Sequence, residues 1–162
     1  MNAFRDELTA GLPDLPQLVR VLLRLIVAGL CGAVIGLQRQ RIGKPAGLRT
    51  HMLVAMGAAL FVMAGFESGM DLSDLSRVIQ GLATGIGFIG AGAILKLTKE
   101  HKITGLTTAA GLWMTAAVGV AAGLGRWGVA GVSAALTWII LALLIRMEAR
   151  NGDGEAAEPK QD

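Results

Sequence analysis

Long apolar stretches alternate along this chain with short segments that carry Lys, Arg, Asp and Glu. Five of the stretches are long enough for a helix to cross a hydrocarbon core, which takes about 20 residues. They lie near residues 15–37, 48–66, 78–95, 105–124 and 127–145. This pattern predicts an all-α integral membrane protein with five transmembrane helices.

Local signals indicate where some of these helices begin. Asp14 and Pro16 have the arrangement of an N-cap followed by a first-turn proline. Asp71 and Asp74 have the spacing of a polar cap before the third helix, and an external cation site is the alternative for the acidic group Glu67, Asp71 and Asp74. We therefore expect capped helix starts ahead of the first and third spans.

The regions flanking the spans are short. Residues 147–162 combine Gly, Ala, Pro and acidic residues that cannot bury a core, so we expect a disordered cytoplasmic tail there. Residues 1–14 form a short extracytoplasmic segment, and residues 15–146 form the five-helix membrane domain. The acidic and basic residues before the first apolar stretch do not match a cleavable signal, so this span is expected to stay in the protein.

A segment between the first two stretches returns between the third and fourth. The first hinge, residues 44–50, and the second hinge, residues 102–108, share the pattern K-x-x-G-L-x-T at an offset of 58 positions. Aligned without a gap, residues 28–59 match residues 86–117 at eleven positions. Helices one and two are therefore expected to repeat as helices three and four.

Composition agrees with a membrane protein. The 162 residues are 53% apolar and 17% charged, and the mean hydropathy is +0.58. The 23 glycines fit this class, because small residues allow helices to approach closely in lipid. The single cysteine, Cys31, cannot form an internal disulfide and is expected to be a small buried residue.

Basic residues gather on one side of the expected membrane domain, and short cytoplasmic loops are enriched in them. One side carries Arg39, Arg41, Lys44, Arg49, Lys96, Lys99, Lys102, Arg146 and Arg150, whereas the other carries Arg5, Arg77 and Arg126. This distribution places the N-terminus outside and the C-terminus and both hinges in the cytoplasm. Alternate helices then run in the same direction, which makes the two halves a parallel repeat about an axis along the membrane normal.

Acidic residues are missing from all five spans. Mg²⁺ prefers oxygen ligands that usually include carboxylates, and proton relays usually need an ionisable group inside the membrane. A self-sufficient metal transporter is therefore disfavoured, although carbonyl and Thr oxygens can also coordinate ions. His51 and His101 lack a neighbouring nucleophile or carboxylate motif, so we expect no enzyme, no metal and no cofactor.

The candidate chemistry is basic. Arg24 must lie within a full-length first span, either reaching outward to the headgroups or making a polar contact inside the bundle. Arg49 and His51 lie in the first turn of the second helix, where they form an anion pocket or Arg49 marks the membrane boundary. The candidate polar site consists of Arg24, Gln38, Arg39, Arg49, Thr50, His51, Thr107 and Thr108.

Glycines crowd the third span. The run from Gly85 to Gly90 matches G-x-G-x-x-G, but it lies inside a span without the strand and acidic residue of a dinucleotide site. Two interpretations remain, close helix packing and a broken helix that lines a cavity. The residues concerned are Gly85, Gly87, Gly90, Gly92 and Trp113.

Four motifs together resemble the MgtC/SapB family of bacterial inner-membrane proteins. They are residues 32–40 (GAVIGLQRQ), 46–51 (AGLRTH), 85–92 (GIGFIGAG) and 105–110 (GLTTAA) with Trp113. The resemblance implies a multi-spanning protein linked to growth under magnesium limitation and, in intracellular pathogens, to virulence. Similar proteins have been proposed to restrain the F-type ATP synthase rather than to move magnesium.

Two departures from that family matter. Gln38 stands where the family usually has Glu, so an ion pair between that position and Arg49 cannot form. The chain also looks like a short form without the soluble C-terminal domain of better-known members. Roles that depend on that domain are not expected here.

The leading hypothesis is a non-enzymatic regulator that binds a membrane protein or lipid. An anionic lipid or phosphate at the cytoplasmic hinge and a homodimer are the expected partners, and nucleic acid is not. The alternatives are a small transporter or channel for an ion or small solute, and a purely structural oligomer built on G-x-x-x-G faces.

Overall fold

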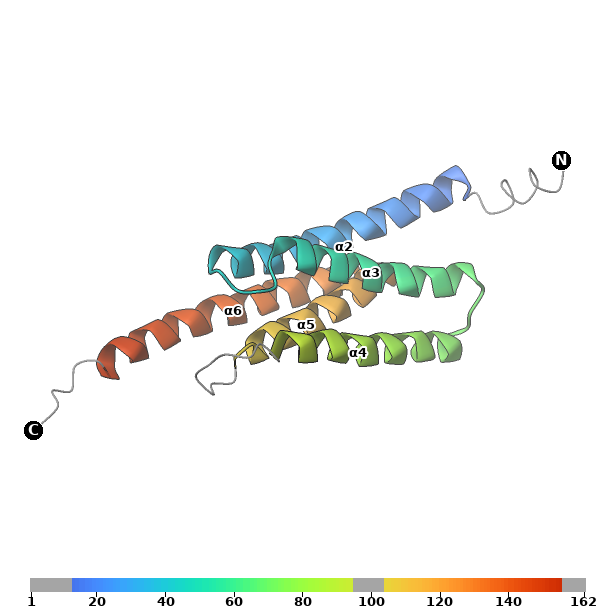
Figure 1. Cartoon of the computed structure of the whole chain (residues 1–162). Coiled ribbons are helices and arrows are strands. Elements are labelled where there is room, and N and C mark those ends of the chain that lie inside the picture. Colours follow the sequence, from blue (N-terminus) through green and yellow to red (C-terminus); the bar gives the residue numbers. More distant parts are fainter. Residues whose placement is uncertain (1–12, 95–103, 156–162) are drawn as a thin grey trace, which may run out of the picture.

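The computed structural model describes residues 13–94 and 104–155, with side chains described for residues 13–94 and 104–143. These residues form an elongated bundle of helices and contain no strand (Figure 1). The helices are α2 (Leu15–Arg41), α3 (Leu48–Glu67), α4 (Leu72–Ile94), α5 (Leu106–Gly123) and α6 (Trp127–Glu155). The predicted all-α class is confirmed.

Two of the helices begin at aspartate caps. The Asp14 carboxylate accepts a hydrogen bond from the Gln17 amide at 2.8 Å, with Pro16 in the first turn of α2. The Asp71 carboxylate accepts one from the Asp74 amide, also at 2.8 Å. Because Asp71 provides this cap, α4 begins at Leu72, six residues before the expected start at residue 78.

The last helix is longer than the expected span. α6 continues to Glu155, into the range 147–162 for which a disordered tail is expected. The segment Met147-Glu148-Ala149-Arg150 consists of strong helix formers, which extend the helix beyond its apolar part. Residues 1–12, 95–103 and 156–162, which include Lys96, Lys99 and His101, lie outside the described residues.

Four helices among the described residues, α2 to α5, are long and apolar enough to cross a membrane. α6 contributes a shorter apolar stretch, Trp127–Leu143. Large apolar side chains point outward on all sides of the bundle, with Leu53, Phe61 and Phe88 each more than half exposed. A surface of this kind suits lipid rather than water, and the protein is a multi-pass membrane protein.

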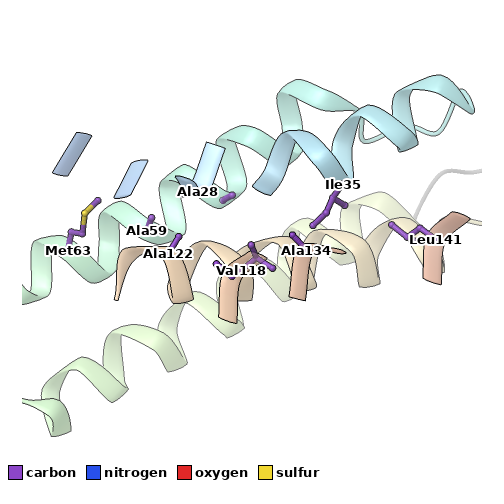
Figure 2. Packing of buried hydrophobic residues seen from close by; sticks show 10 residues of the cluster. Ala28, Ile35, Ala59, Met63, Val118, Ala122, Ala134 and Leu141 are labelled. Carbon is purple, nitrogen blue, oxygen red and sulfur yellow. The ribbon is translucent and has the colours of Figure 1, made fainter. Parts of the chain in front are cut away.

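Small residues bring α3 and α5 together in the centre. A Cβ atom built at Gly119 would lie 2.2 Å from the Ala55 carbonyl oxygen, and one at Gly123 would lie 2.7 Å from that of Ala59. Around this contact the core joins residues of α2, α3, α5 and α6, including Ile35 and Val118 (Figure 2). Close backbone approach therefore replaces large interlocking side chains at this crossing.

As far as the described residues extend, α4 lies at the edge of the bundle, in contact with α3 and α5 but not with α2 or α6. It is one continuous helix, so the broken-helix interpretation of its glycines is wrong. A Cβ at Gly90 would lie 3.4 Å from that of Ala109, whereas Gly85, Gly87 and Gly92 face open space. Of the four candidate glycines, Gly90 is therefore the one that packs closely against another helix inside the bundle.

Two apolar hollows border α4. Gly85 lines a groove of about 620 Å³ together with Phe61 and Phe88. Trp113 lines a second hollow of about 150 Å³ between α4 and α5. Both are lined almost entirely by apolar atoms.

Candidate functional site

Polar side chains are buried at the end of the bundle where α2 stops and α3 and α5 start. Arg39 is 2% exposed, Thr108 is 2% exposed and His51 is fully buried. Gln38, next to Arg39, also has a buried side-chain oxygen. We refer to Arg39, His51 and Thr108 as the Arg39 cluster.

Arg39 connects α2 to α5. It lies in the last turn of α2, and its Nη2 atom donates a hydrogen bond to Thr108 Oγ1 at 2.8 Å. Its Nε atom is buried and has no hydrogen-bond partner within the described part of the chain. Since Thr108 ends the second hinge, this contact joins that hinge to the helix that precedes the first one.

Two glycines of α2 hold His51 in the cluster. A Cβ at Gly36 would lie 2.9 Å from the Cβ of His51, and one at Gly32 would lie 2.6 Å from the His51 carbonyl oxygen. On the other side, a Cβ built at Gly111 of α5 would lie 3.7 Å from His51 Nε2. The imidazole is therefore enclosed between α2 and α5 at positions without side chains.

The hydrogen bonding of His51 determines its chemistry. Its Nδ1 atom lies 3.0 Å from the Gly47 carbonyl oxygen, and a carbonyl can only accept. Nδ1 therefore carries the hydrogen, which leaves Nε2 of the neutral ring as an acceptor. Nε2 is buried and, as far as the described residues extend, unpaired.

Two helix N-termini point to the same end of the bundle. α3 follows Gly47 and α5 follows Gly105, and neither glycine provides a side-chain cap. Gly105 has φ +97°, and a Cβ there would lie 2.3 Å from the Ala93 carbonyl oxygen, so the sharp turn requires glycine. The positive ends of these two helix dipoles lie at the same end as the C-terminus of α2, whose negative end favours the charge of Arg39 in its last turn.

The carboxylates among the described side chains lie at the opposite end of the bundle. Among the described side chains, Asp14, Glu67, Asp71 and Asp74 are exposed near the start of α2, the end of α3 and the start of α4. Gln17 of α2 donates a hydrogen bond to Glu67 there. Arg39 thus has no acidic partner within the described side chains, and these contain no group of His, Cys, Asp and Glu that could hold a metal ion.

The remaining candidate residues are placed differently. Arg24 donates from Nη1 to the Gly123 carbonyl oxygen at 2.7 Å, at the far end of α5, so it makes a polar contact inside the bundle. Arg49 and Thr107 are exposed and Thr50 is half-buried. The structure therefore brings His51, Arg39 and Thr108 together but does not bring Arg49 to them.

The burial of Arg39 can be predicted from the spacing of the apolar and small residues before it, which a count of charges ignores. Ala28, Gly32, Ile35 and Arg39 follow one another at helical spacing, and all four are buried. An arginine that continues an apolar, small-residue stripe is directed inward rather than toward the headgroups.

Comparisons with known proteins agree with the motifs of the sequence. The sequence model of the MgtC family matches residues 25–150. SrpB of Synechococcus elongatus (strain PCC 7942) is 46% identical over 136 residues, with 77% of this chain and 75% of SrpB covered. The Escherichia coli K12 protein named "Putative magnesium transporter YhiD" is 40% identical over 136 residues, covering 80% of this chain and 62% of YhiD.

MgtC of Salmonella typhimurium (strain LT2) is 42% identical over 106 residues, covering 65% of this chain. The chain spans 44% of that protein's length, and less than two thirds of YhiD. No solved structure matches the chain.

Proposed function

The chain belongs to the MgtC family, and we propose that it is a non-enzymatic protein of the bacterial inner membrane that supports adaptation to low magnesium or a related stress. It acts by binding an anionic group at the Arg39 cluster, either free phosphate or a group carried by a membrane protein or lipid. The observation that carries this proposal is a buried arginine without a carboxylate among the described side chains.

The energetics of a buried charge support an anionic ligand. An ionised side chain inside a membrane domain is costly unless it is paired, and within the described residues Arg39 has one side-chain hydrogen bond, to a neutral hydroxyl. Two helix N-termini at the same end add positive potential. An anion at this end pairs with the charge of Arg39 and accepts from the N–H groups at the N-termini of α3 and α5.

A role in magnesium adaptation fits regulation better than transport of the metal. YhiD is the relative whose name connects it with magnesium transport, and the chain spans 62% of it. Mg²⁺ sites usually use carboxylate oxygens. In residues 13–94 and 104–143 the carboxylates are exposed at one end and none lines the interior.

The finer topology belongs to the same proposal, with five spans and both hinges in the cytoplasm. A repeat of α2–α3 in α4–α5 is supported by one pair of contacts. Gly32 of α2 packs on the backbone of His51 in α3, and Gly90 of α4 packs on Ala109 in α5. Each residue of the second contact follows its counterpart in the first by 58 positions.

Growth of a strain that lacks the gene tests the function. Wild type is expected to restore growth in low magnesium, Arg39→Gln is expected to fail, and Arg49→Gln is expected to behave as wild type. Arg49 is the matched control because it is an exposed arginine near the same end. Membrane abundance is measured for each variant, and normal growth of Arg39→Gln at normal abundance contradicts the proposal.

A small transporter or channel is the second candidate, favoured by the unpaired polar atoms inside the bundle. The purified protein in liposomes is tested for flux of Mg²⁺, K⁺, Cl⁻ and phosphate. Flux that depends on Arg39 supports this candidate, and no flux of any of the four excludes it as a carrier of these ions.

A homodimer is part of the proposal as well. Within the described chain α4 has no contact with α2 or α6, and its Gly81 and Gly85 face open space. Small residues on an exposed helix face allow a second helix to approach closely. Crosslinking in native membranes distinguishes a dimer from a monomer.

A further inference from the structure

We propose that the Arg39 cluster binds a protonated phosphate group, either inorganic phosphate or the monoester headgroup of a lipid such as phosphatidic acid. This inference rests on the anionic ligand of the proposed function and names its chemistry. It is carried by two unpaired nitrogen atoms of opposite hydrogen-bonding character, Arg39 Nε and His51 Nε2.

Arg39 supplies the charge and a donor. Its Nε–H has no acceptor within the described residues, and its Nη2 already donates to Thr108 Oγ1. A phosphate oxygen on the free edge of the guanidinium completes a charge-assisted hydrogen bond of the kind that arginine forms with oxyanions. The N-termini of α3 and α5 favour the same negative charge.

His51 supplies an acceptor. Its Nδ1–H donates to the Gly47 carbonyl, so Nε2 of the neutral ring has a lone pair to be satisfied. A phosphate that retains one hydrogen offers a P–OH donor beside its acceptor oxygens. Sulfate and phosphodiesters carry no such hydrogen near neutral pH, so the site distinguishes inorganic phosphate and phosphate monoesters from both.

The two nitrogen atoms belong to one site. Arg39 reaches Thr108 of α5, and the ring of His51 faces Gly111 of the same helix. Residues three apart lie next to each other on a helix face, about 5–6 Å between Cβ positions. A tetrahedral ligand can therefore contact both side chains at the α5 surface.

Access to the site requires local opening. Arg39 Nε and His51 Nε2 are both covered by neighbouring protein atoms. The ligand thus enters at the end of the bundle where α2 gives way to α3, after a side-chain or hinge movement.

The first experiment uses the full chain purified into phosphatidylcholine nanodiscs. Inorganic phosphate is expected to raise the melting temperature, and sulfate at equal ionic strength is expected to have little effect, because ligand that binds the folded state stabilises it. Equal stabilisation by sulfate would overturn the proposal. In parallel, nanodiscs with phosphatidic acid are compared with nanodiscs with phosphatidylglycerol, a phosphodiester.

The two arms identify the source of the phosphate. Stabilisation by inorganic phosphate assigns the site to the free ion, and stabilisation by phosphatidic acid alone assigns it to a lipid headgroup. If neither stabilises the protein, or if phosphatidylglycerol matches phosphatidic acid, the proposal is overturned.

Variants connect the effect to the cluster. Arg39→Gln is expected to weaken phosphate binding at least about tenfold, the scale of one lost charge-assisted hydrogen bond, while Arg49→Gln retains wild-type affinity. Should Arg39→Gln fail to fold, His51→Phe keeps a buried ring and removes the acceptor. This variant is expected to lose the preference for phosphate over sulfate, and an unchanged preference contradicts the role of Nε2.

The experiments distinguish an error in the phosphate-binding proposal from an error in the proposed function. If neither phosphate nor phosphatidic acid stabilises the protein but Arg39→Gln still fails to restore growth, the ligand is a different anionic group. If phosphate binds through Arg39 and growth does not depend on it, the site is real and the proposed function is wrong.

Discussion

At the scale of single residues, Arg39 shows how a charge can be held inside a bundle of apolar helices. The residue is 2% exposed, and its guanidinium donates to the hydroxyl of Thr108, a neutral group. A neutral acceptor compensates only part of the cost of burying the charge. The packing of α2 against its neighbours therefore keeps Arg39 buried in spite of this cost. The contribution of its hydrogen bond to Thr108 can be measured by removing the Thr108 hydroxyl.

Thr108→Val is expected to destabilise the protein by about 1–3 kcal/mol, because the near-isosteric side chain removes the acceptor of a buried donor. The control is Thr107→Val, which changes the neighbouring threonine on the exposed side of α5 and is expected to be close to neutral. Thermal melting in detergent measures both variants. Equal melting temperatures for the two would show that the Arg39–Thr108 hydrogen bond does not stabilise the fold.

At the scale of helices, glycines with the same sequence spacing differ in what they contact. Gly119 and Gly123 of α5 meet the backbone of α3, whereas Gly81 and Gly85 of α4 face open space. Sequence alone cannot make this distinction, because close approach is a property of a pair of helices and not of either one. The caps at Asp14 and Asp71 are local, and for that reason the sequence identifies them.

Gly119→Ala is expected to push α3 and α5 apart and to destabilise the protein by about 1–3 kcal/mol, since its Cβ would lie 2.2 Å from the Ala55 carbonyl oxygen. Gly57→Ala on α3 is the matched control, with no atom within 4 Å of the added methyl. That variant is expected to be neutral or slightly stabilising, because alanine favours the helix more than glycine does. Melting curves that rank the two variants in the opposite order would contradict the assigned crossing.

At the scale of the whole molecule, the hydrophobic pattern predicts five helices, and the observed helices overlap all five ranges. The candidate site is predicted less well. His51 and Thr108 lie at a common end because His51 follows the first hinge and Thr108 ends the second, but Arg49 is exposed. A charge count treats Arg39 and Arg49 alike, since it cannot register that Arg39 continues the buried stripe of α2.

Orientation is the property of the whole molecule that decides which compartment supplies the ligand. The excess of Lys and Arg near the hinges predicts a cytoplasmic position for that end. In a Cys31→Ala background, Arg77→Cys is expected to react with an impermeant maleimide added to intact spheroplasts. Lys44→Cys is expected to react only after permeabilisation; both positions are exposed in the structure.

The reverse labelling pattern would place the Arg39 cluster outside the cell. The expected pattern places it on the cytoplasmic side, because Arg39 lies in the last turn of α2, five residues before Lys44. Phosphate or phosphatidic acid would then reach the cluster from the cytoplasm or the inner leaflet. Labelling of Lys44→Cys is therefore expected to slow when inorganic phosphate or phosphatidic acid occupies the site, and to be insensitive to both in the Arg39→Gln variant.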